Sequence, residues 1–358
     1  MKKSYGKVKR YGFAFNRGPG FWLKKILALL LAGALLFLLG WVIGPAVIDA
    51  GTSTWYALKN AGGGTSASEP TPTPEPTAEP QPTATPEPTP VPVDEEGAWA
   101  WVSLSGLQTP EQAAAAAQNL AQQGARYVVV TLKDRQGYIY YNSALPAAAR
   151  SIAASTIDAA AVAQAIKDAG LVPVAGLCAF QDPTSPYTDR SMGVHYENTE
   201  MFWLDAAAEA GGKPWLNPYA EPAIDYIEGL VAEVMELGFE QVALSGVQFP
   251  ERATARCGYG DTAGVSQSEQ LRRDLAAFAA VAEDKGGALW LTLPLETAAQ
   301  ESPAVLGGPV SALQAERILV ELPAEQTDET AALLEAVKAA AGDAALLVRD
   351  GDWAEIVK

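Results

Sequence analysis

The chain has 358 residues, of which 49% are hydrophobic and 19% are charged, and its formal net charge is −17. Eight of its 25 basic residues precede residue 26, so the remainder carries 17 basic and 42 acidic side chains, a net charge of −25. Because nucleic-acid binding depends on Lys and Arg that meet phosphates, this balance argues against a nucleic-acid partner. An acidic surface of this kind is typical of a domain kept soluble by its charge.

The chain opens with a basic segment and an uncharged run. Residues 1–25 hold eight Lys or Arg and no acid, and residues 26–48 hold no charge. At about 1.5 Å per residue, this run spans the roughly 30 Å hydrocarbon core of a bilayer. The basic flank predicts a single-pass membrane helix with its N-terminus inside and the C-terminal domain extracytoplasmic. The alternative is a cleaved signal peptide, which usually has a shorter apolar run and an A-x-A site.

Residues 49–96 are predicted to form a disordered stalk rich in Gly, Pro, Thr and Glu. Three glycines at 62–64 precede ten prolines between Pro70 and Pro92. Because proline fixes φ and lacks an N–H donor, this stretch should be an extended polyproline II segment. At about 3.1 Å per residue it would reach roughly 70 Å, enough to hold the following domain away from the membrane.

Residues 97–358 have the length of one α/β domain in which strands alternate with helices. Near-continuous apolar strands between helices indicate a parallel sheet covered on both faces. A closed barrel and an open doubly wound sheet both fit this pattern. Seven apolar runs predict the strands: Ala98–Leu104, Tyr127–Lys133, Val172–Phe180, Gln241–Phe249, Ala288–Leu295, Arg317–Leu322 and Ala344–Val348.

Capping residues predict where several helices begin and end. Thr109-Pro110-Glu111-Gln112 has the pattern of a capping box with proline at the first helical position. Asn217-Pro218 predicts a second helix start, and Thr327 or Asp328 predicts a third. A glycine stands where each of five helices should stop before the next strand, at Gly124, Gly170, Gly238, Gly286 and Gly342.

Three strand regions carry a family resemblance. Residues 129–143 read V-V-T-L-K-D-R-Q-G-Y-I-Y-Y-N-S, and residues 174–183 read V-A-G-L-C-A-F-Q-D-P. Residues 215–251 begin W-L-N-P-Y and end L-G-F-E-Q-V-A-L-S-G-V-Q-F-P-E. Across residues 97–350 the chain resembles a family of bacterial glycoside-hydrolase-like proteins with a D-Y-x-R-F-P motif. The resemblance implies a TIM-like (β/α) barrel.

The departures from the family pattern remove charges. Thr131, Ser245 and Pro294 stand where the family has Asp, and Gly176 and Gln248 stand where it has Arg. The family also has a last strand with a W-N segment, whereas this chain reaches Lys358 soon after its seventh predicted strand. We therefore expect a barrel that is one strand short or is closed by an irregular segment.

These losses bear directly on catalysis. Glycoside hydrolysis normally needs two carboxyl groups about 5–9 Å apart, placed in a barrel at the carboxyl ends of strands. With the motif charges gone, we expect a catalytically degenerate domain that binds cell-envelope polysaccharide or oligosaccharide. An active hydrolase would have to use other carboxylates, with Asp134 and Glu296 as the predicted pair and Glu321 as a further candidate. A structural or protein-binding ectodomain is the third hypothesis, since barrels host many functions.

If glycan binds, the resemblance places five residues near it: Lys133, Asp182, Trp215, Ser245 and Gln248. Each also has a structural interpretation. Lys133 and Asp134 would form an ion pair at the barrel rim, and Asp134 and Asp182 would cap backbone amides in loops. The aromatic side chains of loop 181–217, Trp215 among them, would pack over the barrel mouth or stack on sugars.

No cofactor or metal is expected. His195 is the only histidine, and no second His or Cys stands at ligand spacing from it. The two cysteines, Cys178 and Cys257, could form a disulfide in an exported domain, but spacing does not decide whether they do.

Overall fold

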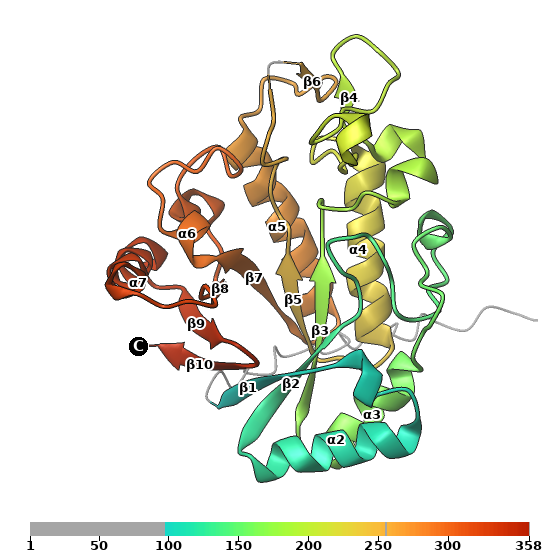
Figure 1. Ribbon diagram of the computed structural model, residues 1–358, viewed down its shortest axis with the longest axis vertical. Helices are drawn as coiled ribbons and strands as arrows, with labels where there is room; N and C mark the ends of the chain where they lie inside the picture. Colours follow the sequence, from blue (N-terminus) through green and yellow to red (C-terminus); the bar gives the residue numbers. More distant parts are fainter. Residues whose placement is uncertain (1–96, 255, 358) are drawn as a thin grey trace, which may run out of the picture. The chain divides into compact units, whose positions relative to one another are not determined.

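The computed structural model of the protein describes residues 97–254 and 256–357, so the predicted segments 1–25, 26–48 and 49–96 lie outside the described residues. Eight strands close into a barrel in the order β1-β10-β9-β8-β7-β5-β3-β2 (Figure 1). The closed ring excludes the open doubly wound sheet and confirms the barrel. The strands are β1 (Ala98–Val102), β2 (Ala125–Thr131), β3 (Val172–Cys178), β5 (Gln241–Ser245), β7 (Ala288–Pro294), β8 (Arg317–Glu321), β9 (Ala345–Asp350) and β10 (Trp353–Val357).

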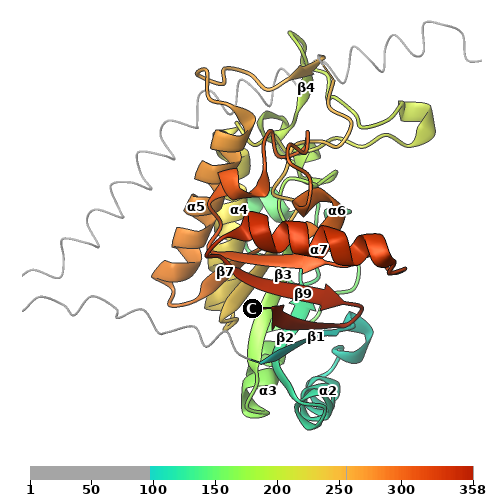
Figure 2. The same cartoon turned by 90° about the vertical axis from the view of Figure 1, so that its left-hand side faces the viewer.

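Helices connect most of the parallel strands and cover the outside of the barrel. The connection from β7 to β8 holds only one turn of α-helix and a 3₁₀ segment at Val310–Leu313, whereas α7 packs against α6 and β9 (Figure 2). The helices are α2 (Pro110–Gln122), α3 (Ala159–Asp168), α4 (Glu221–Glu236), α5 (Gln267–Asp284), α6 (Leu295–Ala298) and α7 (Asp328–Ala341). No helix among residues 97–254 and 256–357 is long and apolar enough to cross a membrane.

Two of the three predicted helix starts are confirmed. The Thr109 hydroxyl accepts a hydrogen bond from the Gln112 backbone N–H, and Thr327 forms a reciprocal capping box at the start of α7. The start predicted at Asn217-Pro218 is wrong, because α4 begins at Glu221. The Asn217 side chain instead accepts from the Tyr219 N–H, a local turn that competes with helix. The five predicted stop glycines all have positive φ, which a left-handed cap requires.

The expectation that the barrel lacks a strand is wrong. β10 pairs antiparallel with both β9 and β1 and so fills the eighth position. A two-residue loop joins β9 to β10, and Gly351 occupies its first position with φ +59°. A glycine with positive φ matches the backbone twist of such hairpins, so the barrel closes without another helix.

The barrel interior is filled with side chains beneath its mouth. Trp99 stacks on Tyr127 with ring centroids 4.7 Å apart and meets Trp290 edge-on at 5.1 Å. The Trp290 indole N–H donates to the Gln241 side-chain oxygen at 2.7 Å, which satisfies a buried donor. The interior is therefore a packed core rather than a pore. A larger apolar core lies between the strands and the surrounding helices.

A small structure lies beyond the carboxyl ends of β3 and β5. β4 (His195–Tyr196) and β6 (Cys257–Gly258) form a two-stranded antiparallel sheet (Figure 1). Val194, Trp203 and Trp215 form a separate apolar cluster beside it. These long loops after β3 and β5 build one side of the barrel mouth.

Candidate functional site

A cleft of about 220 Å³ opens at the carboxyl ends of the barrel strands. Barrel enzymes place their active sites at this end, because the loops that follow the strands converge there. Every parallel strand or the loop after it contributes to the lining. The lining residues are Trp101, Val129, Thr131, Lys133, Asp134, Arg135, Gly176, Leu177, Cys178, Ala243, Ser245, Thr292, Glu321 and Arg349.

Three positions at which the chain departs from the family pattern line this cleft. Thr131 and Ser245 contribute neutral hydroxyl groups, and Gly176 contributes no side chain. The Ser245 hydroxyl donates to the Leu177 carbonyl at 3.1 Å, so it is tied to the neighbouring strand. The next residue, Gly246, has φ +67°, and a Cβ there would lie 2.7 Å from the Cys178 sulfur. This turn ends β5 at Ser245, four residues before the predicted end at Phe249.

Asp134 lines the cleft but its carboxylate is already engaged. One oxygen accepts from the N–H groups of Gln136 and Tyr138, both at 2.9 Å, and the other accepts from the Tyr140 hydroxyl at 2.7 Å. The hydrogen bond to Asp134 raises the pKa of Tyr140 to about 12. The interpretation of Asp134 as a cap for its own loop is therefore confirmed.

Lys133 pairs with Asp182 rather than with the adjacent Asp134. The two side chains have no exposed surface, and Nζ lies 3.1 Å from Oδ2. Burial opposes the Lys133 charge most strongly, but the charge and hydrogen bond of Asp182, together with the nearby Tyr226 and Cys178, outweigh it and raise the pKa of the ammonium group. Nζ also donates to the Cys178 carbonyl at 2.6 Å. The rim pair predicted between Lys133 and Asp134 is corrected to a buried ion pair beneath the cleft.

Asp182 also organises the start of the loop after β3. Its Oδ1 accepts from the backbone N–H groups of Thr184 and Ser185, at 2.8 and 2.9 Å. Its Oδ2 accepts from the Ser185 hydroxyl at 2.7 Å. The carboxylate thus has the three donors and the cation that a buried charge needs. The loop-capping interpretation of Asp182 is confirmed.

Glu321 is the second carboxylate in the cleft, and it is paired with Arg349. The guanidinium donates to the Glu321 carboxylate at 2.5 Å and to the Gly351 carbonyl at 2.8 Å. Its carbon lies 4.1 Å from the centroid of the Trp101 ring, a cation–π contact. Trp101 and Arg349 were not among the predicted site residues, although each is the second-last residue of its strand, β1 and β9.

Thr292 is a further residue that sequence analysis missed. It lies in β7, lines the cleft and is 7% exposed. Its hydroxyl has no hydrogen-bond partner among the described residues. Buried hydroxyls normally find a partner, so this group is available to a ligand or a water molecule.

The remaining predicted site residues lie outside the cleft lining. Glu296 is exposed in the first turn of α6, so the structure does not bring it into the cleft with Asp134. Gln248 is buried in the loop after β5. Trp215 is 2% exposed, and its indole N–H donates to Asp205 at 3.3 Å. The roles predicted for these residues in binding or catalysis stay predictions.

The cysteines and the histidine form no composite site. Cys178 and Cys257 are both free thiols, and burial raises the pKa of Cys178. His195 stacks on Phe202 at 5.1 Å, and burial together with Arg190 lowers its pKa. Across the part of the chain that the structure describes, no three His, Cys, Asp or Glu side chains are grouped to hold a metal ion.

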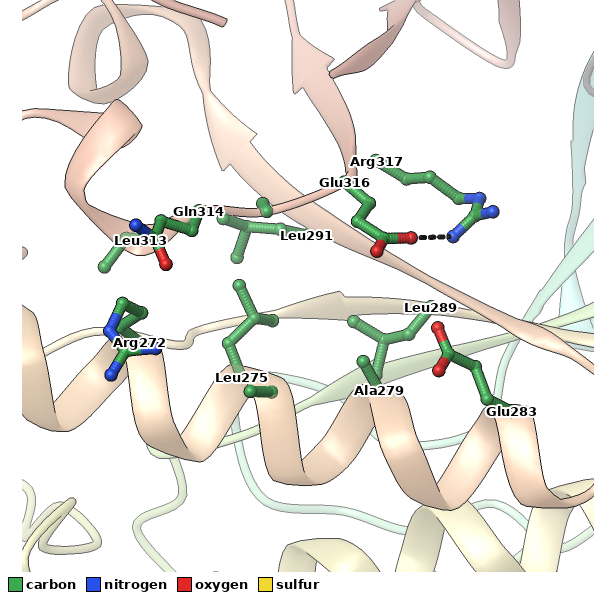
Figure 3. A pocket seen from close by; sticks show the side chains of 12 residues that line it. Arg272, Leu275, Ala279, Glu283, Leu289, Leu291, Leu313, Gln314, Glu316 and Arg317 are labelled. Carbon is green, nitrogen blue, oxygen red and sulfur yellow. Dashed lines mark hydrogen bonds and ion pairs between the residues drawn. The ribbon is translucent and has the colours of Figure 1, made fainter. Parts of the chain in front are cut away.

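A second hollow lies on the outside of the barrel, between α5 and the amino ends of β7 and β8 (Figure 3). Leu275, Leu289 and Leu291 form its floor, and Arg317 pairs with Glu316 at its edge at 3.1 Å. It lies where the connection between β7 and β8 has only a short helix. Because it lies away from the carboxyl ends of the strands, it is not part of the cleft at the barrel mouth.

Solved structures with a similar fold include several glycoside hydrolases. The PgaB (BpsB) glycoside hydrolase domain from Bordetella bronchiseptica has a TM-score of 0.50 at 12% identity, covering 69% of this chain and 80% of its own. A hypothetical protein from Ruminiclostridium thermocellum has a TM-score of 0.45 at 20% identity, covering 54% of this chain and 96% of its own. An N-acetylglucosamine complex of the GH20 exo-β-N-acetylglucosaminidase from Vibrio harveyi has a TM-score of 0.47 at 10% identity. The match covers 70% of this chain and 40% of that enzyme.

At these identities the likeness concerns the fold alone. A search of curated proteins gives no match. A family model does match, over residues 100–285, which is just over half of the chain and includes β1 to α5. On this match the chain belongs to the family described as "Putative glycosyl hydrolase domain".

Proposed function

We propose that the barrel binds cell-envelope glycan at its mouth without hydrolysing it. The observation that carries this proposal is the state of the two carboxylates in the cleft. Asp134 accepts three hydrogen bonds within its own loop, and Glu321 is paired with Arg349. Neither is left free for a sugar.

The cleft lacks a free pair of carboxyl groups, which glycoside cleavage requires. One carboxylic acid must protonate the leaving oxygen, and a second carboxylate must attack the sugar or activate water. A hydroxyl such as that of Ser245 carries no charge at neutral pH and cannot stabilise an oxocarbenium-like centre as a carboxylate does. What remains suits binding, because hydroxyls of Thr131 and Thr292 and the ring of Trp101 line the cleft. Flat rings and neutral hydrogen-bonding groups are typical of ligand pockets.

An active hydrolase is the second candidate, and one observation favours it. Asp134 and Glu321 line the same cleft, from strands on different sides of the barrel. If a bound sugar displaced Arg349 from Glu321, that carboxylate would become available. Glu296 is the weaker member of the predicted pair, since it is not in the cleft lining.

Glycan binding by the full chain tests the proposal. Isothermal titration against cell-wall oligosaccharides should show binding that Trp101→Ala weakens by about tenfold, because a buried aromatic contact is lost. Trp101→Phe keeps a flat ring and should retain most of the affinity. If no oligosaccharide binds, the domain is better described as a structural or protein-binding ectodomain.

We further propose that residues 26–48 anchor the protein in the cytoplasmic membrane, with the barrel outside. The support is the uncharged run behind a basic segment in the sequence. Alkaline carbonate extraction of cell membranes tests this part. An anchored chain stays with the membrane pellet, whereas a chain cleaved after a signal peptide is released.

A further inference from the structure

A second groove, of about 440 Å³, lies next to the barrel mouth along the same loop. Residues 134 and 135 of the loop after β2 line the cleft, and Gln136 and Tyr138 line this groove. The opposite side is formed by Pro183, Thr184 and Tyr187 from the loop after β3. The loop after β2 therefore contributes to both the cleft and the groove.

Two exposed tyrosine rings line the groove. Tyr138 is 48% exposed and Tyr187 is 51% exposed, and they are two of the three large hydrophobic side chains that are this exposed among the described residues. Both belong to ordered loops. The Tyr138 N–H donates to Asp134, and the Tyr187 ring meets Phe202 edge-on at 5.3 Å. Exposed aromatic faces held in place are expected at a binding surface rather than in a core.

The groove is positively charged, whereas the domain as a whole is acidic. Residues 97–358 contain 16 basic and 34 acidic side chains, a net charge of −18. The groove is lined by two cations, Arg150 and Lys213, and by no carboxylate. Neither side chain forms an ion pair within the described residues, and Arg150 makes only a long contact of 3.5 Å to the Tyr187 carbonyl.

Two acids on the neighbouring loops, Asp134 and Asp205, form hydrogen bonds with other groups and no ion pair with Arg150 or Lys213 within the described residues. Asp134 accepts from its own loop and from Tyr140, and Asp205 accepts from the Lys213 backbone N–H at 2.7 Å and from Trp215. In a domain with twice as many acids as bases, a groove with two unpaired cations indicates an anionic ligand.

We propose that this groove is a subsite for an anionic glycan, whose sugar faces stack on Tyr138 and Tyr187 and whose carboxylate or phosphate groups meet Arg150 and Lys213. The Gln136 side-chain amide can bond sugar hydroxyl groups, and the Thr184 oxygen, whose hydroxyl donates to the Gln136 carbonyl at 3.1 Å, can still accept from one. The inference rests on the proposed function, because it assigns the groove to the same glycan that the barrel mouth binds. It adds the chemical class of that glycan, which the cleft does not define.

The test compares matched probes on the full chain. Titration with a tetramer of galacturonic acid, the neutral tetramer of galactose and a glycerol phosphate polymer separates carboxylate, neutral and phosphate ligands. We expect one of the two anionic probes to bind at least tenfold more tightly than the neutral one at low salt, and the better anionic probe identifies the source of the charge. The preference should shrink as salt screens the two cations.

Variants locate the site. The double variant Arg150→Gln/Lys213→Gln should weaken the anionic probe by about tenfold and leave the neutral probe unchanged. Tyr138→Ala/Tyr187→Ala should weaken the anionic probe by a similar factor. Arg252→Gln and Met201→Ala change an exposed cation and an exposed apolar side chain outside the groove, and should have no effect. Unchanged melting temperatures would show that each variant is folded.

Two results would overturn the inference and are distinguishable. If the neutral and anionic probes bind equally and the Arg150/Lys213 variant changes neither, the groove is not the subsite, while the proposed function at the barrel mouth stands. If no probe binds and envelope polysaccharide also fails to bind, the proposed function itself fails and the inference fails with it.

Discussion

Replacing Asp182 by Asn would show whether the Lys133 ion pair is part of the scaffold. Both side chains are without exposed surface, and the ammonium lies 3.1 Å from the carboxylate. The amide oxygen of Asn could still accept from Thr184 and Ser185, but Lys133 would lose its counter-charge. Removing one partner of a buried pair costs about 3–5 kcal/mol, because the other charge is left uncompensated. In a domain of this size that corresponds to a fall in Tm of roughly 6–20 °C.

Urea unfolding followed by tryptophan fluorescence measures this loss. The double variant Lys133→Met/Asp182→Asn is the matched control, because it leaves no buried charge and should recover much of the stability. Burial without a counter-charge should lower the pKa of Lys133 in Asp182→Asn. An unfolded lysine would then bind more protons than the folded one, so the variant should gain stability as pH rises toward about 10.

A loss of less than about 1 kcal/mol in Asp182→Asn would contradict this prediction. It would also be refuted if the double variant were no more stable than the single one. In either case Lys133 would not depend on Asp182, and a direct role for its ammonium in ligand binding would regain support.

Three further predictions concern a buried acid, the barrel closure and the Asp134 loop. Asp274 is 2% exposed, and burial raises its pKa to about 7. The fold therefore holds a proton that the unfolded chain releases above about pH 4, so stability should fall by about 4 kcal/mol between pH 4 and 7. Asp274→Asn should flatten this slope in urea titrations at several pH values, and an unchanged slope would refute the assignment. Gly351→Ala should cost about 1 kcal/mol in urea unfolding because of its φ of +59°, whereas Gly106→Ala, in open space, should change little. Tyr140→Phe removes one donor to Asp134 and should cost about 1 kcal/mol in thermal unfolding, and a loss near zero would mean that the 2.7 Å bond contributes nothing.

Much of the barrel could be predicted because its strands and helix ends carry local signals. All seven predicted strands exist, since buried parallel strands read as apolar runs and a glycine follows five of the six described α-helices, α6 being the exception. The eighth strand was missed because Trp353–Val357 follows a hairpin instead of a helix. Asp350-Gly351-Asp352 between two apolar runs was the available signal.

The site was harder to predict because its partners are distant in the sequence. Lys133 lies beside Asp134 in the chain, yet its ion-pair partner is Asp182, 49 positions away on the next loop. The sequence also did not show which aromatic side chains are exposed. Tyr187 and Trp215 lie in the same loop, but only Tyr187 is exposed. Burial depends on tertiary packing, which residue type alone does not define.

The most direct test of the account is the release of reducing ends when the full chain is incubated with the oligosaccharide that it binds most tightly. We expect binding without release, and no difference between the wild-type chain and the variants Asp134→Asn, Glu296→Gln and Glu321→Gln. Release that is abolished by one of these substitutions would contradict it. That result would show an active hydrolase built on carboxylates other than those of the family motif.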